Sequence, residues 1–390
     1  MLIEEKLQTK VTNECDVLVA GGGFAGVAAA LAAARNGADV MLLEREYMLG
    51  GLGTAGLIVI YLPLCDGNGR QVSFGLAEEL LRLSVKYGGY SEYPKAWLDN
   101  GTPEEKKSGQ RFYVRFNPHL CAIALEEQLI KEGVRIVYGT TVCGVDMSRD
   151  GKIKHIIAEN KSGRSAVKVK SVVDATGDAD VAVLSGVDTV TNDRLNSLAA
   201  WYYCCDGKSA GLKILGASDM PADGSEIDCN TMFTAMSAEE LTEMTISSHK
   251  CILNDYLKKQ SENPDYKIVT MPIIPQVRKT RKIVGKCELG IGKTVGFDDS
   301  VGMIGDWRKP GPVYEIPFGS LYSKKVKNLI MAGRCMSVDD EMWEVTRVIP
   351  ACSVTGEAAG TAAAMSDCFD ELDISQLQKN LEKQGVVLHL

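Results

Sequence analysis

The chain has 390 residues, 45% of them apolar and 24% charged, which is typical of a globular protein with a large buried core. Its formal net charge of −8 repels polyanions, so we do not expect nucleic acid as a partner. Its 12 cysteines form no CxxC pair and no zinc-type spacing with histidine, so we expect reduced thiols, no bound metal and a cytoplasmic location.

The first predicted elements form a βαβ unit. Residues 16–20 read as a short buried strand, 24–36 as a helix closed by Gly37, and 39–43 as a second strand. The stretch 17–34 carries no charge, but its glycine cluster between β-branched and alanine-rich runs favours a strand, a turn and a helix over a membrane span. We therefore expect a parallel sheet with a right-handed crossover.

The next segments predict a helix and a meander that lead to a second strand end. The expected elements are a helix at 118–132 and strands at 134–138, 142–146, 153–159 and 166–169. A separate short strand at 172–175 then runs into a turn at Thr176, Gly177 and Asp178. Open α/β sheets bind ligands at such carboxyl ends of strands, so this turn is a candidate site.

Between residues 187 and 312 the alternation of strands and helices weakens. It returns with a strand at 328–332 and closes with a helix of small residues at 353–366. We therefore predict an α/β protein with a Rossmann-like domain, a parallel sheet with helices plus a β-meander, built from residues 1–186 and 313–390. A smaller α+β substrate domain, 187–312, would interrupt it.

The turn after the first strand carries Gly21, Gly23 and Gly26 at the spacing G-x-G-x-x-G. The first glycine permits a tight turn, the second lets the backbone approach a pyrophosphate, and the third lets the helix pack on the strand. Amides at the helix N-terminus then face the phosphates. Because a strand and a helix flank the motif, it predicts a dinucleotide site rather than a plain turn.

Glu44 follows the second strand at about the 20-residue spacing expected of an acid that binds ribose hydroxyls. A carboxylate at this place disfavours a 2′-phosphate, so FAD or NAD is expected rather than NADP. The fingerprint by itself does not separate FAD from NAD.

Further motifs follow in a fixed order along the chain. They read GGLGTAG at 50–56, FGLAEEL at 74–80, DATGDAD at 174–180, VRKTRKIVG at 277–285, NLIMAGRC at 328–335, RVIP at 347–350 and GEAAG at 356–360. With them the chain resembles the bacterial FAD-dependent oxidoreductase family, a branch of the glutathione-reductase-like flavoproteins, over nearly its full length. The resemblance implies non-covalent FAD and a final helix whose N-terminus points at the flavin.

The resemblance also implies which residues hold FAD, together with the fingerprint. They are Gly21, Gly23, Phe24, Ala25, Gly26, Glu44, Arg45, Gly50, Gly51, Thr54, Val142, Ala175, Thr176, Gly177, Asp178, Gly333, Arg334, Val348, Ile349 and Ala351. The chain departs from the family pattern at 337–343, which read SVDDEMW where the family commonly carries a small residue, threonine and histidine. This departure argues against histidine chemistry at that loop.

Two residues are candidates for catalysis. Arg347 precedes the final helix, where it could bind a substrate carboxylate or pair with a nearby acid at 339–341. His249, at the end of a polar helical stretch, is a candidate base, with an exposed helix residue as the alternative. Cys335 is expected to be a packed thiol, because no CxxC motif supports a redox role.

The expected function is that of an FAD-dependent oxidoreductase, a dehydrogenase or reductase. It would transfer a hydride between flavin N5 and a small polar organic substrate, carboxylated or sugar-like. Two alternatives stay open: an NAD-dependent oxidoreductase without flavin, and a protein in which FAD is mainly structural. After Gly290 and Gly292, Val295 stands where a third glycine would complete a G-x-G-x-x-G motif. An internal NAD(P)H domain is therefore not expected there, and the electron partner is expected to be external.

Overall fold

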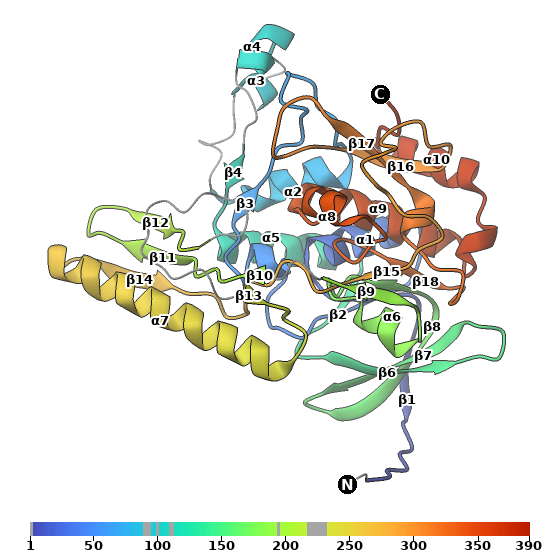
Figure 1. Ribbon diagram of the computed structural model, residues 1–390. Helices are drawn as coiled ribbons and strands as arrows, with labels where there is room; N and C mark the ends of the chain where they lie inside the picture. The colour runs from blue at the N-terminus through green and yellow to red at the C-terminus, as the bar shows by residue number, and fades with distance from the viewer. Residues whose placement is uncertain (1–2, 89–94, 99–100, 109–112, 193–195, 217–231) are drawn as a thin grey trace.

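The computed structural model describes residues 3–88, 95–98, 101–108, 113–192, 196–216 and 232–390. Figure 1 shows a larger body that holds helices α1, α2, α5, α8 and α9, and a smaller part beside it that carries α7 with β11, β12 and β14. The chain begins with an extended segment that projects away from the body (Figure 1). Chain segments of widely different residue number therefore meet in the larger body.

In the described part of the chain, the largest sheet has seven strands in the order β5-β2-β1-β8-β7-β6, and β18 also pairs with β8. Its parallel strands are β1 (Val11–Ala20), β2 (Val40–Leu43), β5 (Arg135–Val137), β8 (Gly163–Asp174) and β18 (Leu329–Met331). The antiparallel meander on β8 consists of β6 (Thr141–Met147) and β7 (Ile153–Asn160). The predicted Rossmann-like α/β fold with its meander is confirmed.

The register of the parallel strands brings four strand ends to one edge. Ala20 of β1 lies beside Leu43 of β2 and beside Asp174 of β8, and Met331 of β18 lies beside Asp174 on its other side. The loops that leave these strands therefore start next to one another, although they are more than 300 residues apart at the extremes of the chain.

One face of the sheet is covered by the helices α1 (Phe24–Arg35), α5 (Pro118–Lys131) and α9 (Ile349–Met365). On these helices pack α2 (Leu76–Ser84), which contacts α1, α5 and α9, and α10 (Ile374–Lys383), which contacts α9. Helices α1 and α9 pack very closely, since a Cβ added to Gly356 or Gly360 would lie 2.3 or 2.0 Å from a carbonyl oxygen of α1. A second apolar cluster, on the other face, joins the meander to α6 (Asp180–Leu184).

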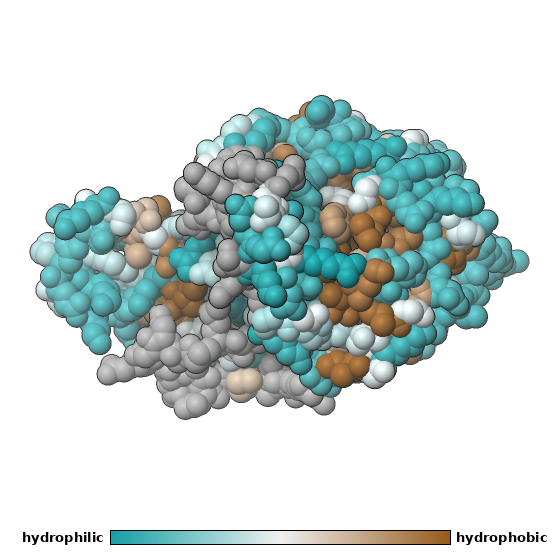
Figure 2. All heavy atoms as spheres, turned by 90° about the horizontal axis from the view of Figure 1, so that it is seen from above, coloured by the Kyte–Doolittle hydropathy of each residue, from teal (hydrophilic) through white to brown (hydrophobic). Residues whose placement is uncertain are grey.

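The smaller part of the molecule has its own sheet, in which β11 (Tyr202–Cys205) lies between β12 (Ala210–Lys213) and β14 (Lys267–Thr270). The 25-residue helix α7 (Ala238–Glu262) packs on it through Ile252 and Tyr256. Seen from above, this part is the smaller lobe on the left, and apolar side chains interrupt an otherwise mainly hydrophilic surface (Figure 2).

The remaining described elements are short, except for one hairpin. The hairpin pairs β16 (Ser300–Gly305) with β17 (Val313–Pro317), so the expected domain border at residue 312 falls between its two strands. The others are η1 (Gly51–Gly53), β3 (Ile60–Tyr61), α3 (Lys95–Leu98), α4 (Pro103–Ser108), β4 (Val114–Arg115), β9 (Thr189–Thr191), β10 (Asn196–Ser197), β13 (Met232–Phe233), β15 (Arg281–Ile283), η3 (Phe318–Ser320), α8 (Asp340–Thr346) and η4 (Phe369–Glu371).

Three expected elements differ from the structure. The separate strands at 166–169 and 172–175 are one strand, β8, because the polar Lys170 between them turns outward and pairs with Asp16 at 2.6 Å. The final helix starts at Ile349 instead of residue 353, since Pro350 fits the first turn of a helix. The helical stretch expected to end at His249 continues to Glu262.

Among the described helices, none combines the length and the apolar character needed to cross a membrane.

Candidate functional site

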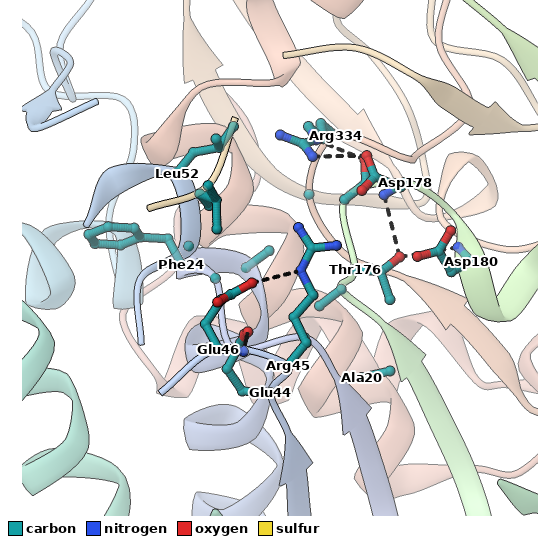
Figure 3. A pocket seen from close by; sticks show the side chains of 18 of the residues that line it. Ala20, Phe24, Glu44, Arg45, Glu46, Leu52, Thr176, Asp178, Asp180 and Arg334 are labelled. Carbon is teal, nitrogen blue, oxygen red and sulfur yellow. Dashed lines mark hydrogen bonds and ion pairs between the residues drawn. The ribbon is translucent and has the colours of Figure 1, made fainter. Parts of the chain in front are cut away.

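A pocket opens at the edge where the four strand ends meet, and residues from both ends of the chain line it. The loops after β1, β2, β8 and β18 contribute to it, as do the first turns of α1 and α9. Figure 3 shows Arg45 extending from the end of β2 toward the turn that holds Thr176 and Asp178, with Arg334 next to Asp178. The topology of the sheet thus gathers the predicted motifs around one cavity.

The three glycines of the fingerprint have three different surroundings. Gly21 has φ +100°, and a Cβ there would lie 2.5 Å from the Ala175 carbonyl oxygen. A Cβ on Gly26 would lie 1.8 Å from the Gly21 carbonyl oxygen, so this glycine allows the helix to pack. A Cβ on Gly23 would meet nothing within 4 Å. Gly23 lines the pocket and leaves room for a ligand to approach the backbone.

Two helices direct their N-terminal amides at the pocket. Helix α1 follows Gly23 and α9 follows Val348, and neither has a side-chain cap or an acidic residue in its first turn. Phe24 and Ala25 of α1, and Ile349 and Cys352 of α9, line the pocket. The unpaired amides and the positive end of each helix dipole make both termini suited to an anionic group.

Glu44 closes one end of the pocket. Its Oε2 accepts the Gly22 amide at 2.6 Å and its Oε1 accepts the Glu46 amide at 2.8 Å. Burial raises the pKa of Glu44, while these two hydrogen bonds act in the opposite direction. The carboxylate is therefore fixed where the fingerprint expects a ribose-binding acid.

Asp174 shapes the turn at the end of β8. Its Oδ1 accepts the amide and the hydroxyl of Thr176, at 3.1 and 2.7 Å, and its Oδ2 accepts the Ala182 amide at 3.0 Å. Burial raises the pKa of this carboxyl group to about 6. These bonds hold Thr176, Gly177 and Asp178 against the pocket.

Arg334 joins the nucleotide side of the pocket to the opposite side. Its guanidinium donates to the Gly177 carbonyl at 2.8 Å, to the Val277 carbonyl at 3.0 Å and to Asp178 at 3.0 Å. The side chain therefore acts as a clamp between the turn after β8 and the segment that leads into β15.

The side of the pocket that comes from the region 187–312 is mainly apolar. We call five of its lining residues the apolar wall: Ala235, Leu241, Ile274, Pro275 and Val277. Gln276 ties this wall to the second glycine loop, since its Nε2 donates to the Gly56 carbonyl at 2.6 Å. The amide of Ile273 also donates to the Ala55 carbonyl, at 3.0 Å.

Arg347 lies at the edge of the pocket in a buried group of charges. Glu344 accepts from Arg347 Nη2 at 2.7 Å and forms a second ion pair with Lys279. Burial raises the pKa of Glu344, but the two cations outweigh this effect and lower it to about 2. The acidic partner of Arg347 on α8 is therefore Glu344, not one of the acids expected at 339–341.

Most of the residues expected at the cofactor line the pocket. They are Gly21, Gly23, Phe24, Ala25, Glu44, Arg45, Gly50, Gly51, Val142, Ala175, Thr176, Gly177, Asp178, Gly333, Arg334 and Ile349. Gly26, Thr54, Val348 and Ala351 lie behind this lining; the Thr54 hydroxyl, for example, donates to the Leu49 carbonyl.

His249 is not brought to this pocket. It is exposed on α7 and borders a separate small cavity next to Ser248. Leu241, in the first turn of α7, lines the large pocket, whereas His249, two turns farther along the helix, borders the small cavity. Cys335 is fully buried, and this burial raises the pKa of its thiol, as expected of a packed and unreactive cysteine.

Apart from Val277, which begins the VRKTRKIVG motif, the sequence did not single out the apolar wall as part of the site. Leu52 and Gly53 lie inside the GGLGTAG motif, and Thr140 and Thr141 directly precede Val142, an expected cofactor residue, so the sequence points to these four lining residues. Ala235, Leu241 and Ile274 carry no motif, and the chain path alone brings them to the pocket.

The chain matches the FAD dependent oxidoreductase family over residues 16–200 and 197–381. It belongs to this family. The cofactor is therefore FAD, and the alternative of an NAD enzyme without flavin is set aside.

Two curated proteins are similar to parts of this chain. Vinyl phenol reductase of Lactiplantibacillus plantarum is 27% identical over 187 residues, which cover 42% of this chain and 37% of that protein. YgcN of Escherichia coli, a probable electron transfer flavoprotein-quinone oxidoreductase, is 26% identical over 235 residues, 54% of this chain and 50% of that protein. The matches thus span half or less of the length of these relatives.

Among solved structures, a geranylgeranyl bacteriochlorophyll reductase-like protein from Thermoplasma acidophilum is 16% identical. The alignment covers 95% of this chain and 83% of that one, with a TM-score of 0.49.

The pocket has the features that FAD requires. Gly23 leaves the backbone open to a pyrophosphate, two uncapped helix N-termini face the cavity, and Glu44 stands at the ribose position. The residues present therefore fit the cofactor of the family.

Proposed function

We propose that this flavoprotein is an enzyme that transfers a hydride between flavin N5 and a small organic substrate. The observation that carries the proposal is the meeting of loops and helix N-termini from both ends of the chain around one pocket, with a separate wall from residues 187–312 across from them. We also propose that residues 187–312 form a substrate domain, which interrupts an FAD-binding domain built from residues 1–186 and 313–390.

Bound FAD would supply the hydride chemistry, while the protein binds, orients and handles charge. Gly23 and the first turn of α1 would hold the pyrophosphate, and Glu44 the adenosine ribose. The amides at the start of α9 would offer a positive dipole end to the negatively charged edge of the flavin.

Arg347 is the residue that we propose for the substrate. Arg347 is one of the residues that line the pocket, its side chain is largely buried, and Glu344 orients its guanidinium. We propose that this guanidinium binds an anionic group of the substrate with a charge-assisted hydrogen bond. His249 has no comparable position, and we do not assign a proton transfer to it.

The relatives support a reductase or dehydrogenase with an external electron partner. One is named for the reduction of a vinyl phenol and the other for electron transfer between a flavoprotein and a quinone. We propose a carboxylated small molecule as the substrate, and a small carrier, a quinone or another protein as the electron partner.

The test begins with the absorption spectrum of the purified full chain and its uptake of added FAD. We expect flavin absorption bands and reduction of the flavin by light in the absence of oxygen. The reduced flavin should then be reoxidised by at least one compound from a panel of enoates, oxo acids and quinones. A colourless protein that ignores FAD contradicts the proposal. Reduced flavin that no acceptor reoxidises favours the remaining candidate, in which FAD is structural.

A further inference from the structure

Four of the five residues of the apolar wall lie outside the cofactor motifs, and the fifth, Val277, begins the VRKTRKIVG motif. The residues of the wall come from two segments, one before and at the start of α7 and one before β15. Leu241, Ile274 and Pro275 are only half-buried, so part of each side chain remains accessible at the pocket. The wall therefore offers carbon atoms, rather than hydrogen-bonding groups, to whatever lies against it.

The first segment of the wall is fixed by a cap at the start of α7. Ser237 is the N-cap, and its hydroxyl oxygen accepts the Glu240 amide at 3.1 Å. The Glu240 carboxylate in turn accepts the Thr234 amide at 2.6 Å and the Thr234 hydroxyl. Ala235 sits inside this closed loop with φ +59°, a conformation that non-glycine residues rarely adopt.

The second segment is fixed from behind. Gln276 is buried, donates to Gly56 and accepts the Trp201 amide at 3.1 Å, so its two neighbours Pro275 and Val277 are held toward the pocket. Both segments are thus held in place by the protein itself, and the wall is formed before any ligand binds.

The charges at the pocket are distributed unevenly around this wall. Arg334 is engaged with Gly177, Val277 and Asp178 in a structural clamp. Arg347, between α8 and α9, also lines the pocket, and its guanidinium is paired with Glu344. A ligand in this pocket therefore meets a carbon surface at the wall and a cationic residue, Arg347, among the other lining residues.

We propose that the substrate is an anion with an apolar body, such as an aromatic or branched 2-enoate, and that Leu241 and Ile274 select for this body. The inference rests on the proposed function and narrows its substrate class. A sugar acid would have to place hydroxyl groups against side chains that offer them no hydrogen bond, and it would lose their hydration without compensation.

The test uses the FAD-loaded, oxidised full chain and three probes. Cinnamate has an apolar body and a carboxylate, gluconate has a carboxylate on a polyhydroxyl body, and cinnamyl alcohol has the apolar body without charge. Binding is measured by the change in flavin absorbance and, independently, by titration calorimetry. We expect cinnamate to bind about tenfold or more tightly than either of the other probes, since each body or charge contact contributes at least that factor.

Two variants test the wall and one serves as the matched control. Leu241→Ser should weaken cinnamate binding about tenfold or more, with a smaller loss for Ile274→Thr, and both should leave gluconate binding unchanged. Leu253→Ser changes the same residue type on the same helix, but this side chain is 51% exposed, so cinnamate binding should not change.

The outcomes separate this inference from the proposed function. It is overturned if gluconate binds as tightly as cinnamate, or if none of the three probes binds. It is also overturned if Leu241→Ser and Ile274→Thr weaken FAD binding instead of cinnamate binding, because the wall would then cover the cofactor. Failure of the chain to hold FAD at all would contradict the proposed function itself.

Discussion

Gln276 connects the two sides of the pocket through a single hydrogen bond to Gly56. The side-chain Nε2 of Gln276 lies 2.6 Å from the Gly56 carbonyl oxygen, 220 positions away in the chain. Its Oε1 accepts the Trp201 amide, and all three residues are buried. The second glycine loop of the nucleotide side and the apolar wall of the substrate side are therefore held together by this hydrogen bond and by the one from the Ile273 amide to the Ala55 carbonyl.

We expect Gln276→Leu to destabilise the protein. The variant leaves the Gly56 carbonyl and the Trp201 amide buried without this partner, and each such group costs about 1–3 kcal/mol. The expected result is a lower Tm together with weaker binding of cinnamate, measured by thermal unfolding and by titration. Gln376→Leu, on the exposed face of α10, is the control and should change neither quantity. Equal shifts in the two variants would show that Gln276 has no special role.

Substitution by alanine should lower FAD affinity at Gly23 and fold stability at Gly26. Gly23→Ala places its Cβ in open space at φ −66°, so we expect the apo protein to keep its stability within about 0.5 kcal/mol. FAD affinity should fall by about tenfold or more, equal to about 1.4 kcal/mol, because the methyl group occupies the ligand's space. Fluorescence titration of apoprotein with FAD measures this loss.

Gly26→Ala should instead damage the fold. Its Cβ would lie 1.8 Å from the Gly21 carbonyl oxygen, so helix α1 must shift, at a cost of about 1–3 kcal/mol or more. Thermal unfolding of the apo form compares both variants with Gly211→Ala, whose Cβ would meet nothing within 4 Å. If Gly23→Ala unfolds at as low a temperature as Gly26→Ala, the division of roles between the two glycines is wrong.

The nucleotide side of the site could be predicted because each part of it is local in the sequence. Gly21, Gly23 and Gly26 lie on one turn, and Glu44 follows at a spacing that the βαβ unit dictates. Even the loop at Gly333 is recognisable from the strand before it. Such motifs need only the chain within a few residues to specify their conformation.

The substrate side could not be predicted in this way. Leu241 and Ile274 are ordinary apolar residues in the sequence, and only the cap at Glu240 and the bond from Gln276 aim them at the pocket. The same limit applies to Arg347, whose partner Glu344 depends on the short helix α8, which the acids of that loop did not reveal. Contacts between distant segments therefore decide the part of the site that selects the substrate.

Arg347→Ala should weaken the binding of cinnamate to the oxidised protein by about tenfold to a hundredfold, since a hydrogen bond to a charged group contributes about 1.5–3 kcal/mol. FAD binding should stay unchanged, and Arg347→Lys should restore part of the affinity. Titrations at low and high salt measure the effect, which should shrink as salt increases in the native protein. An unchanged affinity for cinnamate in Arg347→Ala would remove this residue from the substrate site.

Glu357 makes the stability of the fold depend on pH. It lies buried on α9, where its Oε2 accepts the Leu76 amide at 2.7 Å and so caps helix α2, which has no cap of its own. Burial raises the pKa of this carboxyl group from its ordinary value of 4.5 to about 8. Between these two values the native state binds more protons at Glu357 than the unfolded state does, so the free energy of unfolding falls as the pH rises through this window.

The variant Glu357→Gln tests this dependence, because a glutamine carbonyl can still accept the Leu76 amide but carries no charge. We expect equal stability of the two proteins near pH 5, and at pH 9 a variant that is more stable by on the order of a few kcal/mol. Denaturant unfolding across this pH range measures, for each of the two proteins, the slope of the free energy of unfolding against pH. Glu382→Gln, on the exposed side of α10, should keep the slope of the native chain. If Glu357→Gln shows the same slope of unfolding free energy against pH as the native chain, the Glu357 carboxyl group is not the source of this pH dependence.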